Sequence, residues 1–272
     1  MDMLSRFCRT VRFWFMPREG RELALREAVR EGNADEVRFC LAHGVRIEKD
    51  SGVKALWHAA RRGDRKIAEL LIDGGVDVDA VPPEYHERPL SVAVQGGHRE
   101  VAELLLARGA SVDAPDKDGS QPLHMACMSG SMETVELLLD RGAPVEAVGQ
   151  DGWRPLHVAA LFGTRDIVEL LIARGAEIEA ADKDGDRPLH RASGNDRMEA
   201  AEALLAHGAD TRARNKWGQT PRAMSRLKTM GALLDAAEKE WKAPEERKLE
   251  DLAALRAHHR KLGALRPRGP SL

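Results

Sequence analysis

A repeat of 33 residues constrains the fold of this 272-residue chain more than any other feature. Residues 152–185 read GWRPLHVAALFGTRDIVELLIARGAEIEAADKDG, and the same skeleton returns in residues 119–152 and 185–218. The tract Pro-Leu-His stands at the same place in all three stretches. A sequence with such a period is built from one small structural unit that recurs along an array.

The residues of one unit predict a pair of short helices. Pro155 starts the first helix, because a proline at that position loses an amide that has no partner there anyway. Residues 157–162 continue this helix and Gly163 ends it. Residues 166–174 form the second helix, with apolar side chains at i, i+3 and i+4, and Gly175 caps it. Neither helix buries its apolar face alone, so each unit needs stacked neighbours.

A short polar connection, here called a finger, links each unit to the next. Residues 178–184 are followed by Gly185, and the resulting Asp-Gly pair favours a tight hairpin turn. In an earlier finger Pro82 and Pro83 replace this pair, and they cannot donate ladder hydrogen bonds, which predicts a looser loop. Tyr85 lies on that finger. We interpret it as covering an apolar edge, with a dedicated partner contact as the alternative.

The tract P-L-H-x-A, the following E-L-L and the closing R-G-A-x-[VI]-[DE]-A together resemble the ankyrin repeat, whose unit is 33 residues. The resemblance implies an all-α ankyrin repeat solenoid of about seven helix-turn-helix units with short β-hairpin fingers. The family usually places Thr before the proline. Here Gln121, Arg154 and Arg187 stand in that position and only Thr220 keeps it, a departure that concerns a local capping bond.

Three segments follow from the extent of the repeat. Residues 1–20 form a leader outside the repeat, with the spacing of an amphipathic helix. Residues 21–238 form the array, whose end repeats are atypical because each has one solvated face. Residues 239–272 are predicted to be a C-terminal helix followed by a basic tail, which we interpret as solvated.

The leader carries an apolar face interleaved with arginines. This pattern fits a cap packed on the array, docking on a partner, or membrane contact through residues 1–16. Its arginines interrupt any apolar signal region, so neither a secretory nor a lipoprotein signal is expected. The apolar positions are Leu4, Phe7, Cys8, Val11 and Phe15.

Composition excludes several classes of function. The formal net charge of −2 gives no general basis for binding nucleic acid, and no apolar run reaches the length of a transmembrane helix. Cys8, Cys40 and Cys127 are odd in number and far apart, which favours a reducing compartment over a disulfide framework. We therefore expect a cytoplasmic monomer, located peripherally at a membrane if the leader binds one.

No residue pattern predicts catalysis, a cofactor or a metal site. His124, His157 and His190 recur by whole repeats, whereas metal ligands must converge on one point. The resemblance implies that these histidines bond to the backbone of the neighbouring turn. The finger carboxylates Asp113 and Glu146, with their counterpart Glu179, are interpreted as solvated residues. Nucleophile elbows, phosphate loops and metalloprotease motifs are all missing from the sequence, so the chain is predicted not to be an enzyme.

The resemblance places partner contacts on the concave face, at the finger tips and at two first-helix positions before the glycine. Met128, Trp153, Leu161 and Phe162 come from two adjacent units and are predicted to cluster there as an apolar anchor, which Trp217 would extend. The alternative is that they cover each other or the C-terminal helix. The finger set is Lys117, Ser120, Gln150, Trp153, Lys183, Asp186, Lys216, Trp217 and Gln219. The helix set is Arg61, Arg62, Gln95, Met128, Ser129, Leu161, Phe162, Gly194 and Asn195.

The function predicted from these features is non-catalytic binding of a partner protein on the concave face, as a scaffold or adaptor. The alternatives are a regulator recruited to membranes by the leader and a regulatory partner of an enzyme. Positive side chains on the rim favour a partner segment that is apolar with acidic flanks. These side chains are Lys117, Arg154, Lys183, Arg187 and Lys216, partly offset by Asp116, Asp118, Asp182 and Asp184.

Overall fold

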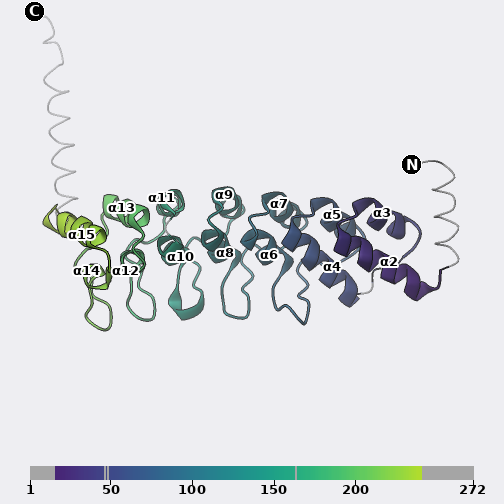
Figure 1. Ribbon diagram of the computed structural model, residues 1–272, viewed down its shortest axis with the longest axis horizontal. Helices are drawn as coiled ribbons and strands as arrows, with labels where there is room; N and C mark the ends of the chain where they lie inside the picture. Colours follow the sequence, from purple (N-terminus) through teal and green to yellow (C-terminus); the bar gives the residue numbers. More distant parts are fainter. Residues whose placement is uncertain (1–15, 46, 48, 163, 241–272) are drawn as a thin grey trace, which may run out of the picture.

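The computed structural model describes residues 16–45, 47, 49–162 and 164–240, which form an elongated array of stacked helix pairs (Figure 1). The first helices of the pairs lie in one row, the second helices lie in another, and the fingers project beyond the first row (Figure 1). The first helices are α2 (Arg18–Glu31), α4 (Lys49–Arg62), α6 (Pro89–Gln95), α8 (Pro122–Ser129), α10 (Pro155–Phe162), α12 (Pro188–Gly194) and α14 (Pro221–Met224). The second helices are α3 (Ala34–Ala42), α5 (Arg65–Asp73), α7 (Arg99–Ala107), α9 (Met132–Asp140), α11 (Arg165–Ala173), α13 (Met198–Ala206) and α15 (Lys228–Glu240).

Helix boundaries follow the sequence signals. Pro155 is the first residue of α10, as predicted, and the prolines at the same place in other units start their helices in the same way. The hydroxyl of Thr220 accepts a hydrogen bond from the amide of Ala223, whereas Gln121 and Arg187 make no such cap with their side chains. The departure from threonine therefore removes this bond from those units.

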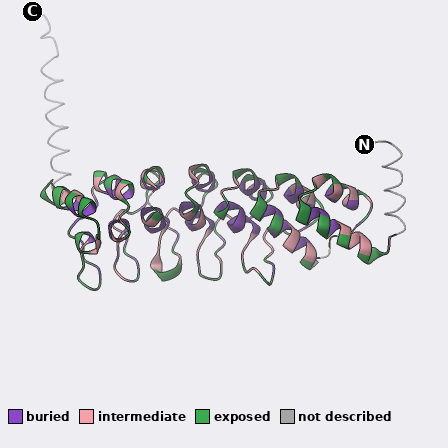
Figure 2. Ribbon diagram, viewed as in Figure 1, coloured by how far each residue is buried: buried purple, intermediate pink, exposed green. Residues whose placement is uncertain are grey.

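The core runs the length of the array as rows of equivalent residues. Leu123, Leu156 and Leu189, one from each of three successive first helices, are almost completely buried. Burying a leucine contributes about 1.5–3 kcal/mol, and each unit shares this burial with its neighbours. Figure 2 shows buried residues along the whole array, in the helices of both rows.

The first helix begins a few residues before the predicted start of the array. Helix α2 begins at Arg18, inside the segment expected to be a leader, and α2 and α4 each have 14 residues, longer than the other first helices. The predicted amphipathic face of the leader falls on residues 1–15, which lie outside the described residues. So does the C-terminal segment beyond Glu240, including the basic tail.

The fingers are turns held by side chains, and the described residues contain no β-strand where hairpins were expected. In the finger of residues 116–120, one carboxylate oxygen of Asp116 accepts from the amides of Asp118 (2.9 Å) and Ser120 (2.8 Å). Asp182 and Asn215 make the same pair of bonds in later fingers. This Asx turn satisfies the amides that a hairpin ladder would have used.

The described helices were also compared with the requirements for spanning a membrane. None of them combines the length and the apolar composition that crossing a bilayer requires.

Candidate functional site

The recurring histidines fasten each finger to the preceding unit. In His157, Nδ1 accepts from the amide of Arg154 (3.1 Å) and Nε2 donates to the carbonyl of Asp186 (3.1 Å). Burial lowers the pKa of His157 to about 4, so the ring is neutral, as this bonding pattern requires. His124 and His190 make the same pair of bonds, and burial lowers the pKa of each. These histidines are structural.

Two of the finger carboxylates that looked solvated are also structural. Glu146 accepts from the amide of Glu177 in the next unit (2.9 Å) and forms an ion pair with Arg154. Arg187 pairs in the same way with Glu179, whose other oxygen accepts from the amide of Asp210. The interpretation of these glutamates as solvated residues was therefore wrong.

Asp113 is the exception among these carboxylates. The residue that would donate to Asp113, in the place that Glu177 has relative to Glu146, is Pro144. A proline has no amide hydrogen to donate. Asp113 instead accepts from the hydroxyl of Ser111, in its own finger, at 2.9 Å. This fastening between units is thus missing at one junction of the array.

The rim is less positive than its sequence suggested. Arg154 pairs with Glu146 and Glu177, and Arg187 pairs with Glu179 and Asp210, so both guanidinium groups are neutralised by neighbours. The expectation that Arg154 and Arg187 supply positive charge to the rim was therefore wrong. Lys117, Lys183 and Lys216 are all exposed, and the ammonium group of Lys183 lies 3.7 Å from the carboxylate of Asp151.

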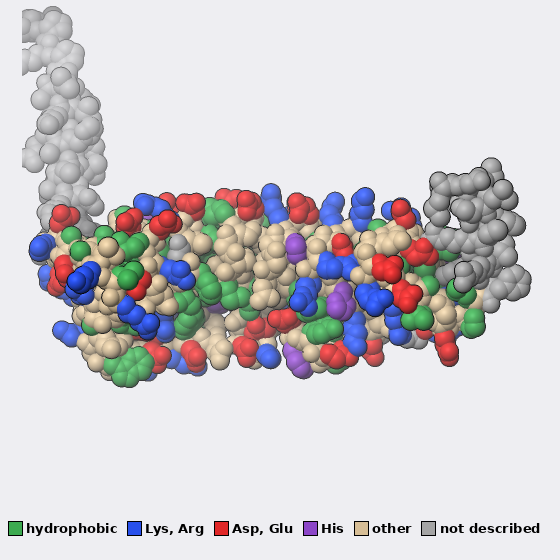
Figure 3. All heavy atoms as spheres, viewed as in Figure 1, with side chains coloured by type: hydrophobic (Ala, Val, Ile, Leu, Met, Phe, Trp, Pro, Cys, Tyr) green, Lys and Arg blue, Asp and Glu red, His purple; other side chains and the backbone are tan. Residues whose placement is uncertain are grey.

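An apolar pocket of about 240 Å³ lies between α8, α10 and the finger of residues 149–153. Met128, Trp153 and Leu161 are half-buried in its wall, and Phe162 is 41% exposed. The structure therefore brings together the four apolar residues that the repeat positions had grouped. Figure 3 shows hydrophobic side chains gathered over α8 and α10. We call this the α8–α10 pocket; its apolar wall is Met125, Met128, Trp153, Val158, Leu161 and Phe162.

The pocket forms where the finger lacks its usual side chain. Gly149 stands where other fingers have Asp116, Asp182 or Asn215, so no carboxylate or amide organises this loop. The loop contains the 3₁₀ turn η1 (Gln150–Gly152). It keeps the backbone bond from the amide of Gly149 to the carbonyl of Trp153 (2.8 Å), which the other fingers also make at the equivalent residues. The finger is thus left without an Asx turn and with an indole at its base.

The next finger, residues 182–186, carries charges at the positions that are apolar in the pocket. Asp182, Asp186 and Arg191 correspond to Gly149, Trp153 and Val158. Asp182 and Asp186 are buried, which corrects two expectations: that Asp182 offsets the rim charge in solvent and that Asp186 is a partner contact.

Several predicted contact residues lie elsewhere. Gln150 and Ser120 line the α8–α10 pocket, whereas Lys117, Lys183 and Trp217 do not. Trp217 is 64% exposed on its own finger, so it does not extend the apolar wall. Met125 and Val158 were missed because they lie mid-helix, three residues before the positions that the resemblance singled out.

A second hollow, of about 540 Å³, lies beside α4 and α6 and has a mixed polar lining that includes Arg61 and Gln95. Tyr85 stacks on Trp57 there, with ring centroids 4.0 Å apart, and thus covers an apolar ring as predicted. Arg62, expected to be a contact, instead donates to the carbonyls of Val29 and Arg30 at the end of α2.

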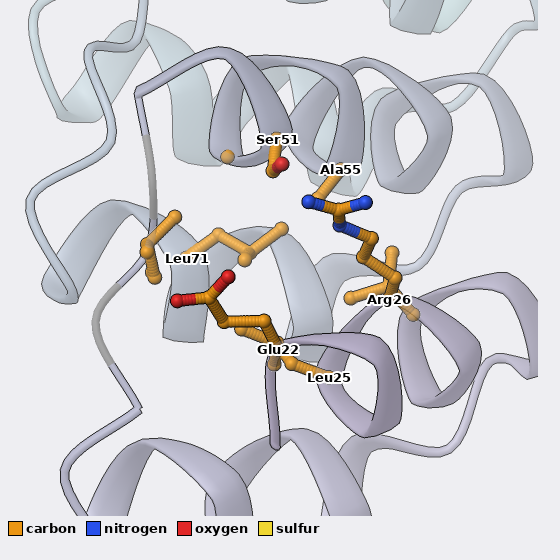
Figure 4. Close-up of a pocket in the computed structure, with 9 residues that line it drawn as sticks. Glu22, Leu25, Arg26, Ser51, Ala55 and Leu71 are labelled. Carbon is orange, nitrogen blue, oxygen red and sulfur yellow. The ribbon is translucent and has the colours of Figure 1, made fainter. Parts of the chain in front are cut away.

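A small cavity of about 20 Å³ lies between α2 and α4 (Figure 4). Leu25 from α2 and Ala55 from α4 line it, with Leu71 of α5 beside them (Figure 4). A volume of this size holds about one water molecule, so it is not a ligand site.

Metal ligation has no support in the described part of the chain, where no group of three or more His, Cys, Asp or Glu side chains is arranged to hold an ion. The described cysteines, Cys40 and Cys127, are both buried. Burial raises the pKa of Cys127, which keeps its thiol protonated and unreactive.

Comparison with known proteins gives one result. A family model described as Ankyrin repeats (3 copies) matches residues 14–82, 90–182 and 144–215, well over half of the chain. None of the curated proteins compared with the chain matches it significantly. Ankyrin repeats are generally non-catalytic modules of protein–protein interaction. The matched segments, the stacked helix pairs and the histidine fastenings together show that this chain belongs to the ankyrin-repeat family.

Proposed function

We propose that this chain is a non-catalytic adaptor that binds a segment of a partner protein in the α8–α10 pocket. The observation that carries the proposal is the open apolar wall, with Phe162 41% exposed beside three half-buried apolar side chains. Contiguous apolar surface on a folded protein marks interaction sites, and aromatic residues dominate the binding energy of such sites.

The lining favours a partner segment that inserts one large apolar side chain. Met125 and Met128 form one side of the pocket, and unbranched thioether chains adapt to the shape of an inserted group. Ser120 and Gln150 at the edge offer hydrogen bonds to the backbone of the segment. Since Arg154 and Arg187 are already paired, acidic flanks would add little, and we expect weak dependence of binding on salt.

A displayed library of random peptides, selected against the full-length protein, tests the proposal. Selected peptides should share one large apolar residue. Phe162→Asp or Met128→Asp should weaken their binding tenfold or more, measured by calorimetry, because a central anchor site contributes about 2 kcal/mol or more.

Trp217→Asp is the matched control, since it places the same charge at an exposed aromatic residue outside the pocket. It should change the affinity by less than about twofold, as expected for a substitution outside the contact region. Binding lost with Trp217→Asp and kept with Phe162→Asp would place the site at the finger tips and refute the proposal. Circular dichroism of each variant checks that the helices remain.

A further inference from the structure

The indole of Trp153 is contacted by a residue that is not part of the α8–α10 pocket. Arg191 lies on α12, in the next unit, and its guanidinium carbon is 4.5 Å from the centroid of the Trp153 ring. A cation over an aromatic face is attracted by the electrons of the ring, and the attraction grows when solvent is excluded. Trp153, which forms one wall of the pocket, is thus contacted by a residue of the next unit.

The guanidinium is itself fixed by two buried carboxylates. Arg191 Nε donates to Asp182 at 3.1 Å, and Nη2 contacts both Asp182 and Asp186, the latter at 3.4 Å. The side chains of the two aspartates are only 1% and 3% exposed, and that of Arg191 is 19% exposed. Removing the cation would leave two carboxylates facing each other away from water, so Arg191 has little freedom to leave.

The carboxylates are held in turn by the finger. Asp182 accepts from the amides of Asp184 (2.8 Å) and Asp186 (3.0 Å). Asp186 accepts from the side-chain amide of Asn215 at 2.8 Å. Backbone, carboxylates, guanidinium and indole therefore form one continuous chain of contacts, and each member is oriented by the one before it.

We propose that Arg191 is a positioning residue for partner binding, which orients the Trp153 indole and so fixes the shape of one wall of the α8–α10 pocket. The consequence for binding rests on the function proposed above, whereas the orientation of the ring is a property of the free protein. The pocket then has one rigid wall at Trp153 and one adaptable wall at Met125 and Met128. A wall that is already oriented costs less entropy on binding.

The substitution Arg191→Lys keeps the positive charge at this position and removes the planar guanidinium group, so it tests the two properties separately. The ammonium group of a lysine keeps the cation beside Asp182 and Asp186, but it lacks the planar fork that contacts carboxylates and stacks on an aromatic ring. Arg187→Lys is the matched control. Arg187 precedes α12, pairs with Glu179 and Asp210, and is not the cation over the Trp153 ring, which is Arg191.

Fluorine NMR of the full-length protein, labelled with 5-fluorotryptophan, tests the orientation directly. The chain has five tryptophans, and Trp153→Phe assigns the resonance of Trp153. Arg191→Lys should shift or broaden this resonance and leave that of Trp217 in place, while Arg187→Lys should move neither. An unchanged Trp153 resonance in Arg191→Lys, or an equal change in Arg187→Lys, overturns the proposal.

Asp186→Asn is the second variant, used if Arg191→Lys does not fold. It removes one carboxylate partner of Arg191 and keeps the contacts with Asp182, so it should move the Trp153 resonance in the same direction by a smaller amount. A Trp153 resonance that stays in place in this variant also overturns the proposal.

Binding of a library-selected peptide tests the consequence. Arg191→Lys should weaken it roughly fivefold, the equivalent of losing one cation–π contact of about 1 kcal/mol, and Arg187→Lys by less than about twofold. A shifted ring with unchanged affinity overturns the role of Arg191 in binding and leaves the pocket function intact. If no peptide binds the unmodified protein, the proposed function fails, and the NMR result alone decides whether Arg191 orients Trp153.

Discussion

The fingers of residues 149–153 and 182–186 occupy the same place in successive units, but they are built from opposite chemistry. One has Gly149, Trp153 and Val158 and borders an open apolar pocket. The other has Asp182 and Asp186, which bury their charge around one guanidinium. The comparison teaches that different residues at three positions of one unit change its exposed surface from apolar to charged, while the core beneath stays the same.

Removing Asp182 should have the largest effect. Asp182→Ala removes the carboxylate that contacts Arg191 most closely, leaving Asp186 at 3.4 Å and Asp184 at 4.0 Å, and it leaves two loop amides without an acceptor. We expect a loss of about 4 kcal/mol in the free energy of unfolding. Asp151→Asn, at an exposed carboxylate, should change it by less than about 0.5 kcal/mol. Urea unfolding measures both. Equal effects would mean that the buried cluster has no special role.

Acid should loosen the charged finger through His157. The folded pKa of about 4 lies below the unfolded value of 6.5, so the unfolded chain binds more protons between these values, and stability falls as the pH falls through that window. The total loss should be about 3 kcal/mol. Unfolding from pH 7.5 to pH 4 should show a smaller decline in His157→Gln than in the unmodified chain. A parallel decline in the two proteins would show that folding does not lower the pKa of His157.

Converting the apolar finger into the charged one tests whether the three positions act together. Gly149→Asp, Trp153→Asp and Val158→Arg in one chain should remove the pocket and lower the affinity for a selected peptide at least tenfold. The conservative variant Val158→Ile keeps the apolar surface and the Trp153 indole, and its affinity should stay within about threefold. Calorimetry of both variants decides. Retained binding in the triple variant would show that the finger does not form the site.

The smallest effect concerns the backbone of the two fingers. Asp151 has a φ of 55°, in the left-handed region, which is unfavourable for aspartate. Its counterpart Asp184 does not have a positive φ. Asp151→Gly should therefore stabilise the chain by about 0.5 kcal/mol, and Asp184→Gly should destabilise it by a similar amount. Thermal unfolding of the two variants should give shifts of opposite sign, and shifts of the same sign would contradict this account.

The array was predictable because its signals are local and recur. Pro155 and the capping glycines each act on their own turn, and His157 bonds to the equivalent place in the next finger, so the period alone locates helices and fastenings. The apolar grouping of Met128, Trp153 and Phe162 was predictable for the same reason: stacked units bring equivalent positions side by side.

The charges were less predictable because their partners lie elsewhere in the sequence. Asp182 looks like a solvated finger residue until Arg191, nine positions later, is seen to cover it. The sequence does not reveal that Arg154 forms an ion pair with Glu177 of the next unit. The glycine at position 149 was a further signal in the sequence for the pocket, since Asp116, Asp182 and Asn215 stand at this place in three other fingers.

Pro144 leaves one junction of the array without a bond that other junctions have, and we expect the units to separate there first. Asp79, Glu146 and Glu179 each receive an amide from the following unit, and at Pro144 that connection has no donor. Stability in a solenoid is a sum over junctions, so the weakest junction opens first when the chain is heated or pulled. We expect the amides of α6 and α7 and those of α8 and α9, which lie on the two sides of this junction, to exchange with solvent as separate blocks. A ligand that spans this junction would hold the two blocks together.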